Sequence, residues 1–225
     1  DYISIYNNTI EMGDIHPEKK SFFKKEYSYD FSNKNFEISN GVVYMAEEEF
    51  LLFDIENQKL LSSNHLNKFL NGKKIDNLKI IEEYLYASFN NGLISIPIET
   101  INMKGDNKNV FSDNKIILYE YNELLNKEVP RGFNDIEKIE DFFYVTNEES
   151  GLSVYKNDFN SLIENFSFNG DSSNSLASSS PTKLMYINDE NMLYIGSIGS
   201  GLFGLNLKNK TFKNIRSDQG LLSNN

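Results

Sequence analysis

The chain has 225 residues, 33 acidic against 22 basic side chains, and a formal net charge of −11. A chain this acidic repels both anionic lipid and a duplex, which carries a phosphate charge roughly every 1.7 Å, so no nucleic-acid or membrane-surface partner is expected. The sequence has no Cys and two His, which excludes disulfides, thiolate metal sites and cysteine nucleophiles and leaves little for a histidine-based triad or metal centre.

The composition predicts a folded domain. Hydrophobic residues make up 39% of the chain and aromatic residues 13%, which is enough for a sizeable core. No apolar run reaches about 18 residues, so no membrane contact is expected within this segment. The start alternates like a strand over residues 2–6, and residues 218–225 have the composition of a linker. We therefore expect an excised part of a longer protein.

Short runs rich in Ile, Val, Phe and Tyr follow one another along the chain and predict short strands. Residues 1–31 are interpreted as the last two strands of a partial unit. After them, four predicted strands align on a tyrosine. They are residues 42–46, 84–88, 142–146 and 192–196, and the tyrosines are Tyr44, Tyr86, Tyr144 and Tyr194. The tyrosines are 42, 58 and 50 residues apart, which indicates an internal repeat.

Each tyrosine segment is the second strand of a predicted four-stranded unit. A meander of that size cannot bury both of its faces alone, but radial packing of several such sheets does so. The predicted fold is all-β, a partial β-propeller of about four to five four-stranded antiparallel blades. The expected boundaries are 1–31 for a partial blade, 32–64 for a blade, 65–122 for a blade with an insertion, 123–170 and 171–217 for two further blades, and 218–225 for a linker to a missing blade.

Two dipeptides predict tight hairpin turns. Asn40-Gly41 separates the first and second predicted strands of the first full unit, and Asn91-Gly92 separates the second and third strands of the next unit. Asn and Gly both tolerate a positive φ, which such turns require. Gly151 and Gly201 take the place of Gly92 in the later units, whereas the first unit has Glu49 there, so its turn is expected to differ.

The segment 193–206, continued by 210–212, resembles the two-component regulator propeller repeat. Residues 220–225, Gly-Leu-Leu-Ser-Asn-Asn, are similar to the linker between blades of that family. The resemblance is strong over 184–225, fair over 85–96 and 142–155, and weak before Gly41. The chain departs from the family in having tyrosine where the family usually has tryptophan.

The resemblance implies the ligand-sensing region of a bacterial two-component or hybrid sensor. A periplasmic or extracellular location, a small polar ligand such as a saccharide, and a homodimer formed through the full-length protein all follow from it. Signalling would then pass to a domain absent from this chain. A non-catalytic scaffold for protein–protein interaction is the alternative. A propeller lyase or glycosidase is less favoured, so no enzymatic activity and no cofactor are expected.

Several motifs allow more than one interpretation. The four tyrosines could form an aromatic ligand ring, but aromatic wedges packed between blades are favoured. Glu47, Glu48 and Glu49 are interpreted as solvated turn residues rather than metal ligands. The glycine-rich residues 196–201 lie between predicted strands and have neither a Lys-Ser/Thr pair nor a helix to hold a phosphate, so a phosphate loop is rejected.

The candidate ligand-binding residues come from location. In a propeller, the turns between second and third strands and the linkers between blades emerge on one face, and loops on a rigid scaffold commonly carry binding residues. This argument selects Asn90, Asn91, Glu148, Glu149, Ser197 and Ser200. It identifies a place and not a chemistry, and no metal ligand is expected among these residues.

Overall fold

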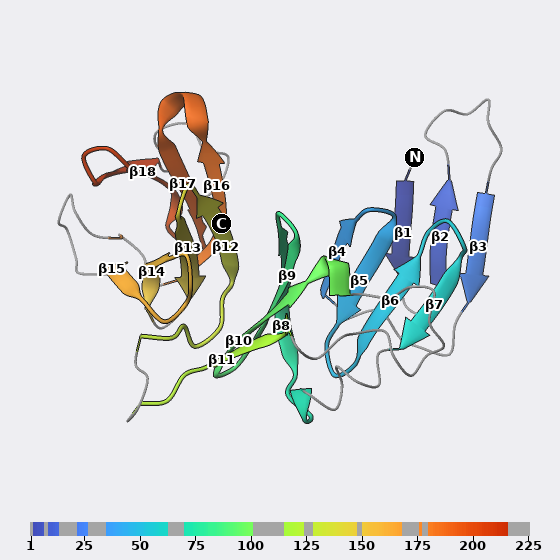
Figure 1. Cartoon of the computed structure of the whole chain (residues 1–225). Coiled ribbons are helices and arrows are strands. Elements are labelled where there is room, and N and C mark those ends of the chain that lie inside the picture. The colour runs from blue at the N-terminus through green and yellow to red at the C-terminus, as the bar shows by residue number, and fades with distance from the viewer. Residues whose placement is uncertain are drawn as a thin grey trace.

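The computed structural model describes residues 2–6, 9–13, 22–26, 35–62, 70–100, 115–123, 128–147, 150–167, 176 and 180–215. These residues form antiparallel sheets that succeed one another in chain order across the molecule, from the N-terminal sheet at one end to the C-terminal sheet at the other (Figure 1). The predicted all-β fold, a partial β-propeller, is confirmed. Within the described residues, no helix is long and apolar enough to cross a membrane.

We number the sheets in chain order. Sheet I contains β1 (Tyr2–Tyr6), β2 (Thr9–Gly13) and β3 (Phe22–Glu26). Sheet II contains β4 (Asn35–Ser39), β5 (Val42–Ala46), β6 (Phe50–Asp54) and β7 (Lys59–Ser62). Sheet III contains β8 (Ile75–Ile81), β9 (Tyr84–Phe89), β10 (Gly92–Pro97) and β11 (Ile117–Glu120). The expectation of two strands before residue 31 is wrong, because three strands pair there.

Sheet IV contains β12 (Asp135–Ile139), β13 (Phe142–Asn147), β14 (Gly151–Lys156) and β15 (Leu162–Phe166). Sheet V contains β16 (Pro181–Ile187), β17 (Met192–Ser197), β18 (Gly201–Asn206) and β19 (Thr211–Ile215). Two 3-10 helices, η1 (Ile98–Thr100) and η3 (Asn188–Glu190), lie in connections. In sheets II to V, each strand pairs with the strand that follows it in the chain.

The aligned tyrosines occupy one register position in these four sheets. Tyr44 lies opposite Glu37 and Leu52, Tyr86 opposite Lys79 and Ser95, Tyr144 opposite Glu137 and Val154, and Tyr194 opposite Met185 and Gly204. Their agreement shows that the repeat found in the sequence is a structural unit. The four tyrosine side chains therefore lie on the equivalent faces of their respective sheets.

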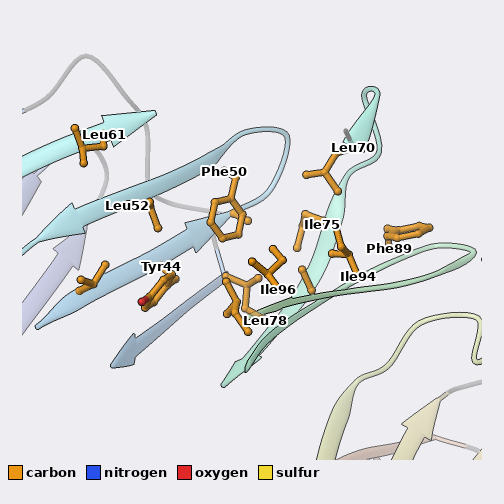
Figure 2. Packing of buried hydrophobic residues seen from close by; sticks show 14 residues of the cluster. Tyr44, Phe50, Leu52, Leu61, Leu70, Ile75, Leu78, Phe89, Ile94 and Ile96 are labelled. Atoms are coloured by element: carbon orange, nitrogen blue, oxygen red, sulfur yellow. The ribbon is translucent and has the colours of Figure 1, made fainter. Parts of the chain in front are cut away.

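The core lies between the sheets. Because successive residues of a strand point to opposite faces, Val43 and Met45 pack with Ile10 against sheet I, whereas Tyr44 and Ala46 pack against sheet III. Figure 2 shows the second of these clusters, in which side chains of sheets II and III meet. Further clusters fill the spaces between sheets III and IV and between sheets IV and V. Every sheet is thus stabilised by its neighbours.

The tyrosines contribute to these clusters to different extents. Tyr44 is 1% exposed and Tyr86 is 6% exposed, so both are packed between sheets as expected of aromatic wedges. Tyr144 is half-buried and packs against the cluster between sheets IV and V. Tyr194 is also half-buried, and its hydroxyl donates a hydrogen bond of 2.7 Å to Glu190.

The first strands of successive sheets lie closest together. Contacts join β4 to β8, β8 to β12, and β12 to β16. Asp135 on β12 links three of these strands, because its carboxylate accepts hydrogen bonds from Lys79 Nζ at 2.9 Å and from the backbone N–H of Leu184 at 3.0 Å. Burial raises the pKa of two other carboxyl groups on the first strands, Glu37 and Glu137.

Asparagine side chains in the first strands, or just before them, join neighbouring sheets. Asn35 Nδ2 donates to the carbonyl oxygen of Asp76 at 2.6 Å, Asn77 Nδ2 to that of Phe133 at 2.9 Å, and Asn134 Nδ2 to that of Pro181 at 2.9 Å. We call these three bonds the asparagine clamps. They recur once at each junction between sheets II and V.

One of the two turn predictions is correct. Asn40 and Gly41 form a two-residue turn between β4 and β5, with φ of 49° and 74°. The other is displaced by one residue, because Gly92 pairs with Phe89 and the turn consists of Asn90 and Asn91. Gly92 is required by a close approach of strands, since a Cβ there would collide with the carbonyl oxygen of Tyr119 on β11.

The first full unit has the different turn that its sequence indicates. Three residues, Glu47, Glu48 and Glu49, separate β5 from β6. Glu47 forms an ion pair of 3.1 Å with Lys74, while Glu48 and Glu49 are exposed.

Candidate functional site

Two adjoining cavities open at the end of sheet III where the turn between its second and third strands lies. The larger is lined by sheet III and the residues next to its strands, and the smaller lies between sheet III and sheet IV with its preceding linker. The larger has a volume of about 630 Å³ and the smaller about 250 Å³. Asp76 and Asn90 line both cavities, so the two adjoin, and together we call them the amide groove. Its size lies in the usual range for small-molecule sites.

The lining of the amide groove is rich in carboxamides. Six asparagines contribute to it: Asn77, Asn90, Asn91, Asn122, Asn134 and Asn147. Each carboxamide has both donor and acceptor capacity. Charged side chains of both signs surround them: Lys73, Lys74, Arg131, Asp76 and Glu120.

One wall of the groove is the linker that precedes sheet IV. The carbonyl oxygen of Phe133 accepts hydrogen bonds from Asn77 Nδ2 at 2.9 Å and from Ser88 Oγ at 3.1 Å. The carbonyl oxygen of Gly132 accepts one from Asn147 Nδ2 at 3.2 Å. Side chains of sheets III and IV therefore hold the linker in place, and the wall is formed before any ligand enters.

Aromatic rings orient two of the cations. The Arg131 guanidinium lies 4.1 Å from the centroid of the Tyr121 ring, and its Nη2 donates a hydrogen bond of 2.8 Å to the Tyr121 hydroxyl. Lys73 Nζ lies 4.9 Å from the centroid of the Phe89 ring and forms an ion pair with Glu120. Such contacts fix the direction of long side chains that would otherwise lose entropy on binding.

Asp76 is the carboxylate at the junction of the two cavities. Partial burial raises its pKa, and the nearby ammonium of Lys74 opposes that shift. The hydrogen bond to Glu47 raises the pKa of Lys74 itself. Asp76 is nevertheless exposed on β8, so its carboxylate can accept hydrogen bonds from a molecule in the groove.

The structure separates the six candidate residues selected from the sequence. Asn90 lines both cavities and Asn91 lines the larger one. Glu148 and Glu149 lie outside the described residues. Ser197 is buried in β17, where its Oγ has no hydrogen-bond partner among the described residues, and Ser200 is half-buried in the turn that follows. Neither serine contributes to the walls of the amide groove.

Sequence reasoning missed several of the groove residues. Asp76 and Asn77 lie on a first strand, and Arg131 lies in a linker. The sequence argument predicts linkers at this face but selects no residue in 123–134. An asparagine at the start of successive first strands, as in Asn35 and Asn77, is the one signal in the sequence that could have drawn attention to this edge.

No protein-family model matches the chain, and no curated protein matches it in sequence. Among solved structures it is similar to PorZ of Porphyromonas gingivalis, a bacterial surface component of the type-IX secretion system. The TM-score is 0.63 at 12% identity, and the match covers 99% of this chain and 34% of PorZ. The chain is also similar to the extracellular domain of a hybrid two component system from B. thetaiotaomicron, with a TM-score of 0.56 at 16% identity, over 81% of this chain and 24% of that one.

A third similar structure is BamB from Moraxella catarrhalis, with a TM-score of 0.54 at 8% identity, over 95% of this chain and 61% of BamB. The chain thus spans about a quarter of the length of the hybrid-system domain and about a third of PorZ. At these identities the likenesses bear on the fold, and they agree with a partial β-propeller.

Proposed function

We propose that the chain is part of the ligand-sensing region of a bacterial two-component or hybrid sensor that lies outside the cytoplasm. The proposal rests on two kinds of support. The repeat in residues 184–225 resembles the two-component regulator propeller repeat, and one similar structure is the extracellular domain of a hybrid two component system. A second similar extracellular domain comes from a one component system of the same organism, with a TM-score of 0.53.

The observation that carries the ligand part of the proposal is the amide groove. The carboxamides of Asn90 and Asn91 have both donor and acceptor capacity for a saccharide, while those of Asn77, Asn134 and Asn147 already donate to backbone carbonyls. Phe89 and Tyr121 supply apolar surface in the larger cavity. We therefore propose a small polar ligand, a saccharide, that hydrogen-bonds to Asn90 and Asn91. In this proposal the chain binds its ligand without converting it.

The groove also suggests how binding could be signalled. Asp76, Asn77 and Asn90 belong to sheet III, whereas Arg131 and Asn147 lie in the linker before sheet IV and in sheet IV itself. A ligand that contacts both sides adds contacts across this junction and so favours one relative tilt of the two sheets. A signalling domain elsewhere in the full protein would respond to that tilt.

The test is calorimetric titration of the chain with a panel of neutral monosaccharides and disaccharides. Each amide–hydroxyl hydrogen bond contributes about 0.5–1.5 kcal/mol, so a variant with Asn90→Ala and Asn91→Ala is expected to bind roughly tenfold more weakly. Asn160→Ala is the matched control, because Asn160 is an exposed asparagine in the turn between β14 and β15, away from the groove.

Two results would count against the proposal. If no member of the panel gives saturable binding while a protein partner does, the chain is an interaction scaffold. If a sugar binds but the paired Asn90 and Asn91 variant binds it as tightly as the Asn160 variant, the ligand lies elsewhere and the amide groove is not its site.

A further inference from the structure

A separate cavity of about 300 Å³ lies between sheets IV and V. It is lined by Glu140 from the turn between β12 and β13, by Asn191 after η3, and by Lys210 from the turn before β19. These connections emerge at the opposite end of the strands from Asn90 and Asn91, because each strand of a meander reverses direction. The cavity is therefore distinct from the amide groove.

The equivalent space between sheets III and IV is filled by Phe159. This side chain is 1% exposed, and its ring centroid lies 4.8 Å from that of Phe143, 5.2 Å from that of Tyr119 and 5.7 Å from that of Tyr86. Val154 on β14 lies opposite Tyr144 in the strand pairing, and Phe159 comes five residues after Val154 in the chain. It therefore closes the space against the tyrosine of the preceding sheet.

Sheet V carries no aromatic residue at the matching position. Gly204 is the partner of Tyr194, and the residue five positions later is Asn209. Asn209 is exposed in its turn, where its side-chain oxygen accepts a hydrogen bond from Thr211 Oγ1 at 2.7 Å. Since Asn209 remains in the turn, the space beside Tyr144 stays open, and Tyr144 is half-buried where its counterpart Tyr86 is buried.

Three aromatic rings line the open cavity: Phe142, Tyr144 and Tyr186. All three are half-buried and pack on one side against the apolar cluster between sheets IV and V. The same three side chains contribute to the wall of the cavity. An aromatic face carries partial negative charge, so several rings around one space attract a cation.

Two carboxylates stand at the same cavity. Glu140 is exposed, and Glu164 has 31% of its side chain exposed and forms an ion pair with Lys210, which is 57% exposed. Burial raises the pKa of the Tyr144 hydroxyl, and the charges of Glu164 and Glu140 add to that shift, which agrees with both carboxylates lying near the ring. Two negative charges against one positive charge leave the cavity with a net negative charge.

We propose that this cavity binds an organic cation through its alkylated ammonium group. The three rings would contact the methyl or methylene groups around the nitrogen, and Glu140 and Glu164 would supply the opposite charge. Aromatic rings around one space commonly recognise quaternary ammonium groups, and the two carboxylates add the attraction of opposite charge. The ammonium of Lys210 would compete with the ligand for Glu164, because it already forms an ion pair with that carboxylate.

The experiment is an NMR or calorimetric titration of the full chain with tetramethylammonium chloride, at constant ionic strength maintained with sodium chloride. Saturable binding is expected, and neopentyl alcohol, an uncharged molecule of similar shape, is expected to bind at least roughly tenfold more weakly, since it lacks the charge that the rings and carboxylates attract. No saturable binding of tetramethylammonium, or equal binding of the alcohol, would overturn the proposal.

Three variants separate the contributions. Tyr144→Leu removes the ring but keeps an apolar side chain and is expected to weaken binding roughly tenfold, whereas Tyr144→Phe keeps the ring and is expected to bind as the parent chain does. Lys210→Gln removes the competing ammonium and is expected to tighten binding several-fold. Unchanged binding in Tyr144→Leu, or weaker binding in Lys210→Gln, contradicts the assignment.

The thermal midpoint of each variant is measured beside the parent chain, so that loss of fold is separated from loss of binding. Glu140→Gln is the variant least able to disturb the fold, because Glu140 is exposed in a turn. It is expected to weaken tetramethylammonium binding several-fold, while Glu83→Gln, in the corresponding turn of sheet III, leaves binding unchanged. Equal affinities for these two variants would also refute the proposal.

Discussion

Asp135→Ala removes the carboxylate at which the first strands of three sheets meet. Asp135 Oδ1 accepts hydrogen bonds from Lys79 Nζ and from the backbone N–H of Ile136, both at 2.9 Å, and Oδ2 accepts one from the N–H of Leu184 at 3.0 Å. The Asp135 side chain is 3% exposed, so water does not readily replace the carboxylate once it is removed.

The expected cost follows from the groups left behind. A buried N–H without an acceptor costs about 1–3 kcal/mol, and Leu184 is 7% exposed. Breaking a buried ion pair can cost about 3–5 kcal/mol, but 26% of the Lys79 side chain is exposed and can recover hydration, so less than half of that value applies. We therefore expect Asp135→Ala to lower the free energy of unfolding by about 3 kcal/mol.

Urea denaturation at pH 7, followed by far-UV circular dichroism, measures this change. Asp135→Asn keeps one acceptor oxygen and is expected to lose about half as much stability as Asp135→Ala. A double-mutant cycle with Lys79→Met should give a coupling energy of about 1 kcal/mol or more. If Asp135→Ala lowered the free energy of unfolding by less than about 1 kcal/mol, the reasoning that Asp135 joins the sheets would be refuted.

Phe159→Ala removes the ring that fills the space between sheets III and IV, so it should lower the free energy of unfolding in urea by about 3–5 kcal/mol; a loss below about 1 kcal/mol would contradict that packing. Burial raises the pKa of Glu37 and Glu137, so the stability linked to their protonated forms is present below pH 4.5 and is lost as the pH rises through the raised values. Replacing either with Gln should therefore raise the melting temperature at pH 7 but not at pH 4, and a gain at both pH values would argue against the linkage. Gly151→Ala would place a Cβ 2.5 Å from the carbonyl oxygen of Phe166 at a φ of +79°, whereas Gly199→Ala has a similar φ of +76° and no atom within 4 Å. Gly151→Ala should therefore lower the melting temperature more than Gly199→Ala does, and equal losses would show that backbone strain alone accounts for the effect.

The repeat was predictable because its signal is local. A second strand centred on a tyrosine, preceded and followed by apolar runs, is visible in the sequence at Tyr44, Tyr86, Tyr144 and Tyr194, and the pairing register places all four alike. The turn in sheet III was misplaced by one residue because the preference of Asn-Gly for tight turns is also local. The register depends instead on the approach of Tyr119 to Gly92, and those residues are far apart in the chain.

The residues of the candidate site could be predicted only in part, because some of them are positioned by contacts between residues far apart in the chain. Asn90 and Asn91 could be selected because a turn between second and third strands has a known place in a propeller. Arg131 could not, because the path of its linker is set by hydrogen bonds from Asn77 and Ser88 to Phe133, across sequence separations of 56 and 45 residues. No local pattern in the sequence encodes such a path.

The asparagine clamps have a consequence for how such a molecule can change over generations. The two inner repeats each hold a donor amide for the repeat after them and an acceptor carbonyl for the repeat before them. In sheet III these are Asn77 and Asp76, side by side in β8, and before sheet IV they are Asn134 and Phe133. A whole unit can therefore be duplicated or deleted, and the flanking units still meet donor to acceptor. Gain or loss of a blade can therefore keep this donor and acceptor matched at the joint, whereas the bonds that Asp135 accepts from Lys79 and Leu184 belong to three particular sheets and would be lost with sheet IV.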